Sequence, residues 1–350
     1  MTHRLRYFAI ASVTPVVLLA LGAIFGGWLA VSALIYMTLL SFILDEGVSK
    51  LAGAADPEEE FTAANQLSTI LAASHFLLLP LMIFALTGGT GISIGAGAAL
   101  FLAAGLFFGQ VSNSNAHELI HRTDRLLFNL GKWVYISLLF GHHTSAHNKV
   151  HHRFVASDDD PNSAREGETF YAFAPRAWKG SFVAGYEMEK ADIARAKTSG
   201  KRRVNPYLTY VSGAVLMLIL AWVIAGGMGL VVYLVLCFHA QIQLLLSDYV
   251  QHYGLMRARR PDGSYEPVGE HHSWNSPHWF TSHLMMNAPR HSDHHAHPSR
   301  PYPALRLPDA TRAPMLPYSL PTMATLALFP TLWNRVMGRS LARWQDIRKV

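Results

Sequence analysis

Histidine residues gather in three dense clusters along the chain. The densest lies at residues 291–295 and places three imidazoles around one carboxylate. Two earlier clusters, at residues 117–121 and 147–152, each begin with a histidine that precedes another by four residues. On a helix this spacing puts both rings on one face, and imidazole is the commonest biological metal ligand. One such pair is more often two surface histidines, but three clusters in one chain predict a metal site.

The clusters and one isolated histidine together offer more ligands than a single ion needs. The isolated residue is His252, which follows a charge-free tract and shares a helical face with Asp248. A catalytic zinc is held by about three protein ligands, so two metal ions are the economical interpretation. Imidazole suits iron, copper, nickel and zinc alike, and ligand type leaves the metal open. The candidate metal ligands are His117, His121, His147, His151, His152, His252, His291, His294 and His295.

Carboxylates stand beside these histidines. Glu118, Asp248 and Asp293 are expected to take part in catalysis, and Asp248 could also orient the ring of His252. The acidic run at residues 158–160 follows the second cluster and could accept ring N–H groups from ligating histidines, although a solvated turn is an equal alternative. Histidines outside the spaced pattern, namely His75, His142 and His143, are expected to be structural rather than ligands.

The composition predicts a membrane protein. Hydrophobic residues make up 51% of the chain and charged residues only 15%, which is unusual for a soluble domain. Residues 7–44, 67–116 and 207–247 contain no charged side chain, and each tract is about twice the ~20 residues that cross a bilayer as a helix. A glycine cluster near the middle of each tract predicts a turn. We therefore expect an all-α integral membrane protein with six transmembrane helices in three hairpins, at residues 7–25, 28–44, 67–87, 91–116, 207–225 and 229–249.

The placement of lysine and arginine predicts the orientation. The hairpin tips carry no charge, and all basic residues fall in segments on the opposite side. By the positive-inside tendency that side is the cytoplasm, so both termini and the histidine clusters face it across a bacterial inner membrane. We expect one domain over residues 1–350, with cytoplasmic catalytic segments at 117–203 and 250–350. Anionic lipid headgroups account for the net charge of +6, and nucleic acid is not needed as a partner.

Two other protein classes compete with a membrane-edge metalloenzyme. Residues 117–121 match the zinc-peptidase motif in which glutamate is the general base, but that motif uses only two of the candidate ligands. A metal transporter would carry its histidines inside the spans, whereas here only His75 and His239 are embedded. Histidines collected at the ends of the spans favour an enzyme that acts on lipid-dissolved material.

The motifs resemble those of the integral-membrane alkane monooxygenases, the AlkB family, over residues 117–302. The matching features are the three clusters, Asp160-Pro161 after the second, and Tyr253-Gly254-Leu255 after His252. The resemblance implies that the histidines hold two non-haem irons, which activate O₂ to hydroxylate a terminal C–H bond. It also implies electrons from NADH through rubredoxin reductase and rubredoxin, since the chain has no dinucleotide-binding motif and a single cysteine.

Three positions depart from the family pattern. Ala146 stands where glutamate is common, Val150 where glycine is common, and Asp248 where asparagine is usual. A related hydroxylase or desaturase acting on a fatty acyl chain or an aryl methyl group is therefore the alternative function. Arg257, Arg259 and Arg260 are expected to attract an acidic electron-carrier protein, although topology explains the same charges.

Overall fold

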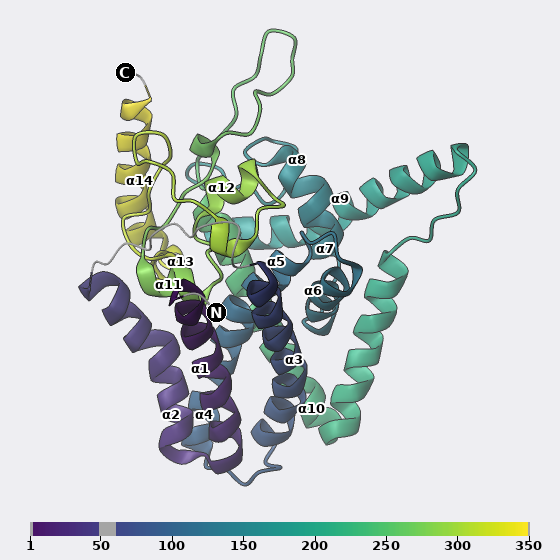
Figure 1. The fold of residues 1–350 in the computed structure, drawn as a ribbon, viewed down its shortest axis with the longest axis vertical. Helices are drawn as coiled ribbons and strands as arrows, with labels where there is room; N and C mark the ends of the chain where they lie inside the picture. The colour runs from purple at the N-terminus through teal and green to yellow at the C-terminus, as the bar shows by residue number, and fades with distance from the viewer. Residues whose placement is uncertain (1–2, 49–60, 349–350) are drawn as a thin grey trace.

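The computed structural model describes residues 3–48 and 61–348. Within these ranges the regular structure is helical, and the strand-like pairings are two isolated bridges. The acidic connection at residues 45–60 carries no residues expected to do chemistry, and its part at residues 49–60 lies outside the described residues. The architecture has two layers, a set of long apolar helices and a layer of mostly short helices, loops and two longer helices at one end of them (Figure 1).

Five helices are long and apolar enough to cross a membrane by length and composition. They comprise α1 (His3–Phe25), α2 (Gly27–Ile35) with its π-helical extensions η1 (Tyr36–Leu40) and η2 (Ile43–Gly47), α3 (Phe61–Leu86), α4 (Ile94–Phe107) continued by η3 (Phe108–Ser112) and α5 (Asn113–Leu119), and α10 (Tyr207–His252). The chain is thus a multi-pass helical protein, as its charge-free tracts predicted.

The helix α10 is divided by a sharp bend. Ala225 and Gly226 have non-helical backbone angles, and Gly226 adopts φ 57° and ψ −144°, a conformation that glycine tolerates because it lacks a Cβ. Turns at Gly26 and at residues 87–93 separate the other long helices. Each predicted glycine cluster therefore lies at a turn, and the three turns lie at the same end of the molecule (Figure 1).

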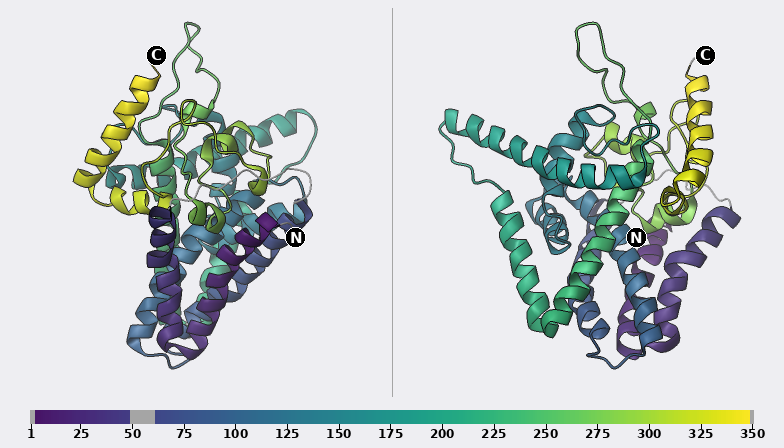
Figure 2. Two further views of the ribbon diagram at one scale, coloured as in Figure 1. Left: turned by 60° about the vertical axis from the view of Figure 1, so that its left-hand side comes forward. Right: turned by 180° about the vertical axis from the view of Figure 1, so that it is seen from behind.

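The second layer contains two helices that hydrophobic tracts alone did not predict. These are α9 (Phe170–Thr198), which runs across the arms of α10, and α14 (Pro330–Ile347) on the opposite side (Figure 2). Two shorter apolar stretches, at residues 126–140 and 323–333, form α6 (Arg125–Ser137), α13 (Leu320–Ala327) and the start of α14. The remaining short helices are α7 (His143–Ala146), η4 (His147–His151), α8 (His152–Phe154), η5 (Glu270–His272), α11 (Trp279–Leu284), α12 (His291–Ala296) and η6 (Tyr302–Ala304).

Two carboxylates at the end of the second long helix fasten the layers together. Asp45 is buried, and its carboxylate accepts the backbone N–H groups of Phe280 (2.7 Å) and Thr281 (3.2 Å) at the start of α11. Glu46 accepts the N–H of Ser319 at 2.8 Å, just before α13. These bonds satisfy the donors that a helix N-terminus leaves open.

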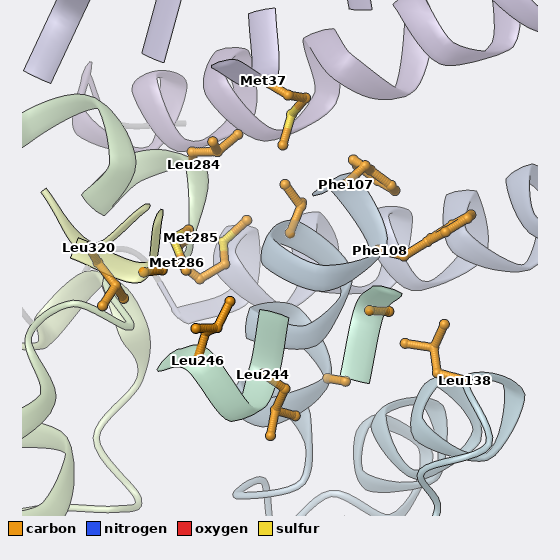
Figure 3. Close-up of a cluster of buried hydrophobic side chains, with 14 of the residues drawn as sticks. Met37, Phe107, Phe108, Leu138, Leu244, Leu246, Leu284, Met285, Met286 and Leu320 are labelled. Carbon is orange, nitrogen blue, oxygen red and sulfur yellow. The ribbon is translucent and has the colours of Figure 1, made fainter. Parts of the chain in front are cut away.

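Apolar packing fixes the helix ends that carry the histidines. Met37, Phe107, Leu244, Leu246 and Met285 belong to one buried cluster that joins the first hairpin to α10 and to the second layer (Figure 3). The helix α6 lies directly against α5. The packing is so close that a Cβ at Gly131 would stand only 2.7 Å from the carbonyl oxygen of Ala116. Glycine at this position therefore allows the backbone of α6 to support the helix that carries His117.

Candidate metal centre

The nine candidate histidines converge in two groups. The larger group contains five residues, and within it the possible ligand atoms all lie within 4.8 Å of one another. Its members come from α5 and the turn after it, from η4, α8 and α12, and they are His117, His121, His147, His152 and His294. The segments are far apart in the sequence, so the group exists only once the two layers have packed.

The smaller group contains the other four histidines within the same limit of 4.8 Å. They are His151, His252, His291 and His295, and all four are buried. His252 ends α10, as expected from its position after the apolar tract. Gln251 next to it donates from Nε2 to the carbonyl of Ala288 at 3.1 Å, and this bond places the end of α10 beside α12.

A π-helical turn distributes the second cluster between the two groups. The spacing of His147 and His151 predicted that both rings share one helical face. Their ring centroids do lie 5.2 Å apart, but the two residues belong to different groups. Residues 147–151 form a π-helix, whose turn closes after five residues rather than four. Consequently His147 and His152 belong to the larger group, while His151 belongs to the smaller one. The α-helical rule does hold in α12, where His291 and His295 share a group and His294 belongs to the other.

The distances between ring nitrogens fit metal ligation. The Nε2 atoms of His147 and His121 are 3.0 Å apart, and those of His147 and His152 are 2.9 Å apart. In the smaller group, the Nε2 atoms of His252 and His291 are 2.9 Å apart. Two nitrogens bound at ~2.1 Å to one ion would be separated by roughly 3.0–3.4 Å. Imidazoles whose Nε2 atoms all face each other cannot satisfy one another by hydrogen bonds alone, so the donor set suits a shared cation.

Most of these rings are held in the neutral form that metal ligation requires. Burial lowers the pKa of His147, His294 and His295 well below the usual histidine value, and the neighbouring imidazoles add to the effect. Burial likewise lowers the pKa of His121 to about 3. A cluster of buried imidazoles resists protonation because each positive charge would lack both water and a counter-ion.

His151 differs because a carboxylate faces its second ring nitrogen. Burial acts to lower its pKa, but the Asp160 carboxylate, 2.9 Å from Nδ1, outweighs this effect and raises it. Asp160 is itself buried and accepts a hydrogen bond from the Ser163 hydroxyl at 2.7 Å. Within the acidic run, Asp160 thus lies where it can orient the ring of His151, whereas Asp158 and Asp159 are exposed.

The three carboxylates expected to be catalytic have other partners. Glu118 pairs with Arg122 and accepts the N–H of Tyr302 at 3.1 Å. Asp293 pairs with Arg300 and accepts the N–H of Arg306 at 2.8 Å. Neither belongs to a histidine group, and their contacts fasten the segment after α12 to the site. Because Glu118 is engaged in this way, the zinc-peptidase arrangement gains no support.

Asp248, the third of these carboxylates, has different surroundings. Its carboxylate accepts a hydrogen bond from Asn162 Nδ2 at 2.7 Å, and among the described residues no hydrogen bond joins it to His252. The expectation that it orients that ring is therefore wrong. Asp248 instead lines a chamber of about 50 Å³ that also touches His117 and His291, one histidine from each group.

Histidines expected to be structural lie outside both groups. His75 has partners for both ring nitrogens, at 3.0 Å from the Ser112 hydroxyl and 2.8 Å from the Ser137 hydroxyl. His142 packs against Phe182. His143 lines the chamber although it belongs to neither group, and no spacing in the sequence distinguishes it for this role.

Further residues were not singled out by the sequence. Asn113, Tyr135 and Gln251 line the chamber, and their positions in apolar or neutral stretches carry no motif. A third group, of Glu266, His271 and His272, lies apart from the nine histidines. In it His272 Nε2 is 3.1 Å from the Glu266 carboxylate.

Comparison with known proteins gives the same class of molecule. Residues 93–327 match the fatty acid desaturase family. Alkane 1-monooxygenase 1 of Pseudomonas aeruginosa is 31% identical over 81% of this chain and 76% of its own length. Alkane 1-monooxygenase 1 of Alcanivorax borkumensis is 34% identical over 72% of this chain and 62% of its own length. The xylene/toluene monooxygenase hydroxylase component XylM of Pseudomonas putida is 27% identical over 98% of this chain and 90% of its own length.

Fold and site together define a multi-pass helical membrane protein with two adjoining histidine groups at the ends of its long helices. The chain belongs to the fatty acid desaturase family, in its alkane 1-monooxygenase branch. It spans about three fifths of the length of several alkane monooxygenases that it matches.

We predict that His252 is needed for one of two bound metal ions. Replacing His252 with alanine removes one of the four ligands of the smaller group, and the metal content per chain should fall by about half. His75→Ala is the matched control, since it removes a buried imidazole whose partners are two serines, and it should leave the content unchanged. Elemental analysis of detergent-purified protein measures both. Full metal content in the His252 variant would contradict the assignment.

Asp160→Asn should weaken metal binding in the smaller group. The substitution preserves size but removes the charge that polarises His151, and loss of such a partner typically costs ~10–100-fold in metal affinity. Competition with a chelator, measured for this variant and for the exposed control Asp159→Asn, gives the ratio of their metal affinities. Equal affinities in the two variants would mean that Asp160 has only a folding role.

Proposed function

We propose that this protein is a membrane-bound alkane 1-monooxygenase, which uses O₂ to convert an alkane into a 1-alkanol. The observation that carries the proposal is the chamber that touches one histidine from each group. A reacting C–H bond in this chamber would lie next to both metal positions and at the membrane end of the site. The names of the P. aeruginosa and A. borkumensis relatives support the same activity.

The metal we propose is iron, with two ions per chain. His117, His121, His147, His152 and His294 would hold one ion, and His151, His252, His291 and His295 the other. When bound, the pair of irons supplies the activation of O₂. Ligand type alone does not select iron, so this choice rests on the family. The chain's own contribution is to keep the ligands neutral, oriented and shielded from water.

An alkane offers no polar group, so its affinity must come from burial. Each CH₂ removed from water contributes ~0.8 kcal/mol, and membrane lipid is the reservoir from which such a substrate would enter. The chamber walls include apolar side chains such as Leu244 and Met285 beside the histidines. We expect catalytic contributions from the chamber-lining Asp248, whose position allows contact with substrate, and structural support from Glu118 and Asp293.

Electrons must come from a partner protein, and we propose rubredoxin, reduced by an NADH-dependent rubredoxin reductase. The sole cysteine is buried in α10, and one cysteine cannot hold an iron–sulfur cluster, which takes about four. The loop after α10 places basic residues over the second histidine cluster, since Arg257 donates to the carbonyl of Arg153, next to His152. Arg259 and Arg260 extend this basic edge, which would attract an acidic carrier.

A second candidate substrate is an aryl methyl group. The alignment to the xylene/toluene monooxygenase component covers 98% of this chain and 90% of that protein, more of each chain than the alkane monooxygenase alignments described above. Terminal methyl carbons of alkanes and methyl groups on aromatic rings require the same C–H oxygenation. The substrates therefore need to be compared directly.

The purified protein, loaded with iron and supplied with reduced rubredoxin, its reductase and NADH, should oxidise n-decane to 1-decanol. Under isotopically labelled O₂ the alcohol should carry the label, and iron should be present at about two atoms per chain. Toluene in a parallel reaction tests the aryl alternative. An alcohol oxygen derived from water, an alkene product, or a protein that contains one zinc and no iron would contradict the proposal.

The proposed orientation places both termini and the metal centre in the cytoplasm of a bacterium, with six spans crossing the inner membrane. The two arms of α10 would be separate spans that meet at Gly226. We expect reporter fusions at Gly227 to register the periplasm and fusions at Arg202 the cytoplasm, because lysine and arginine are retained on the cytoplasmic side. The reverse pattern would overturn this topology.

A further inference from the structure

A groove lies beside the chamber, on the side of the apolar helices. It has a volume of about 510 Å³, within the usual range for small-molecule sites. Its walls come from η1, η3, α10 and α13. Leu39 and Phe42 at its rim are 54% and 51% exposed, so the groove opens where membrane lipid would surround the protein.

The groove and the chamber follow the same two helices. Leu106 and Gln110 line the groove, and Asn113 and His117, further along the same span, line the chamber. On α10, Leu246 faces the groove and the adjacent Ser247 faces the chamber. Figure 3 shows Met37 and Leu246 in the apolar cluster around this region. A molecule that enters at the rim would therefore have its inner end near the histidines.

A pair of amides interrupts the apolar lining. Gln110 is 5% exposed and donates from Nε2 to Gln243 Oε1 at 3.4 Å, while its own Oε1 has no hydrogen-bond partner among the described residues. Gly109 makes the pairing possible, since a Cβ there would collide with the side chain of Gln243. A buried amide oxygen without a partner is costly, and a ligand that donates a hydrogen bond would satisfy it.

Three hydroxyl groups in the groove wall do not need such a ligand. Thr38 donates to the carbonyl of Leu34 at 2.6 Å, and Ser41 donates to that of Tyr36 at 2.8 Å. Thr325 donates to the carbonyl of Pro321 at 2.9 Å. The buried polar atoms of the wall that lack a partner among the described residues are therefore the Gln110 amide oxygen and the Thr281 hydroxyl.

We propose that this groove is the substrate channel and that Gln110 and Gln243 select an apolar molecule that carries a hydroxyl group. The inference rests on the proposed function and adds to the alkane a second substrate class for the same site, a long-chain alcohol that is oxygenated at its far methyl end. Seven residues separate Gln110 from His117, so the two positions are roughly 10 Å apart along the helix. A hydroxyl bound at the amide pair is therefore well separated from the histidines, and it is distinct from the hydroxyl that the reaction forms.

The test compares 1-decanol with n-decane in the wild type and in the Gln110→Leu/Gln243→Leu double variant. Changing both amides leaves neither one unpaired. The ratio of kcat/KM values, 1-decanol over n-decane, should fall about tenfold in the double variant, as expected for loss of one buried hydrogen bond. The ratio cancels differences in membrane partitioning between the substrates. Thr69→Val, which removes a hydroxyl bonded within α3 to the carbonyl of Asn65 at 2.8 Å and outside the groove lining, should keep the wild-type ratio.

A binding measurement separates this inference from the proposed function. A photoreactive diazirine analogue of 1-decanol should label peptides that contain Met37, Leu106 or Leu246, and 1-decanol should compete better than n-decane in the wild type but not in the double variant. Labelling with this pattern and no oxygenation would refute the monooxygenase activity alone. Unchanged ratios or competition in the double variant, or labelling elsewhere, would overturn the role of the amide pair. Metal content matching the wild type confirms that each variant is folded.

Discussion

Nine imidazoles can share one small volume only while they remain uncharged and are held in place by rigid backbone. Burial provides the first condition for most of the rings, because a protonated imidazole there would lack water and a counter-ion. His151 is the exception, since the Asp160 carboxylate lies 2.9 Å from its Nδ1. Helix ends provide the second, since the rings project from α5, η4, α8, α10 and α12 and the turn after α5. The apolar helices thus serve the metal centre twice, as a membrane anchor and as the frame that fixes those ends.

Buried carboxylates join this frame to the outer layer. Asp45 receives the first N–H groups of α11, Glu118 receives that of Tyr302, and Asp293 receives that of Arg306. Each of these hydrogen bonds fixes the backbone of one segment to the carboxylate of another segment of the chain. A buried carboxylate is unfavourable unless hydrogen-bonded or paired, so these bonds specify where the loops must lie. The acidic residues near the histidines are therefore largely architectural, with Asp160 and Asp248 the ones that face the site.

The long apolar helices and the gathering of the nine histidines could be anticipated from the sequence, for physical reasons. Charge-free tracts and glycine turns are local properties, and clustered imidazoles are rare enough to indicate a site. The division of His147, His151 and His152 between groups could not be predicted, because α- and π-helical turns have no distinguishing signature in this segment. The partners of Glu118 and Asp293 depend on loop packing, and the amides Gln110 and Gln243 lie 133 residues apart. Amphipathic helices such as α9 carry too many charges to be detected as apolar tracts.

The two histidine groups are linked covalently as well as by packing. His151 and His152 are consecutive residues that belong to different groups, and so are His294 and His295. Consecutive Cα atoms are ~3.8 Å apart whatever the surrounding structure does. The peptide units at residues 151–152 and 294–295 therefore limit the distance between the two metal positions. If the membrane-spanning helices moved to admit a bulky molecule, both metal positions would move together. The distance between the two metal positions would therefore change little.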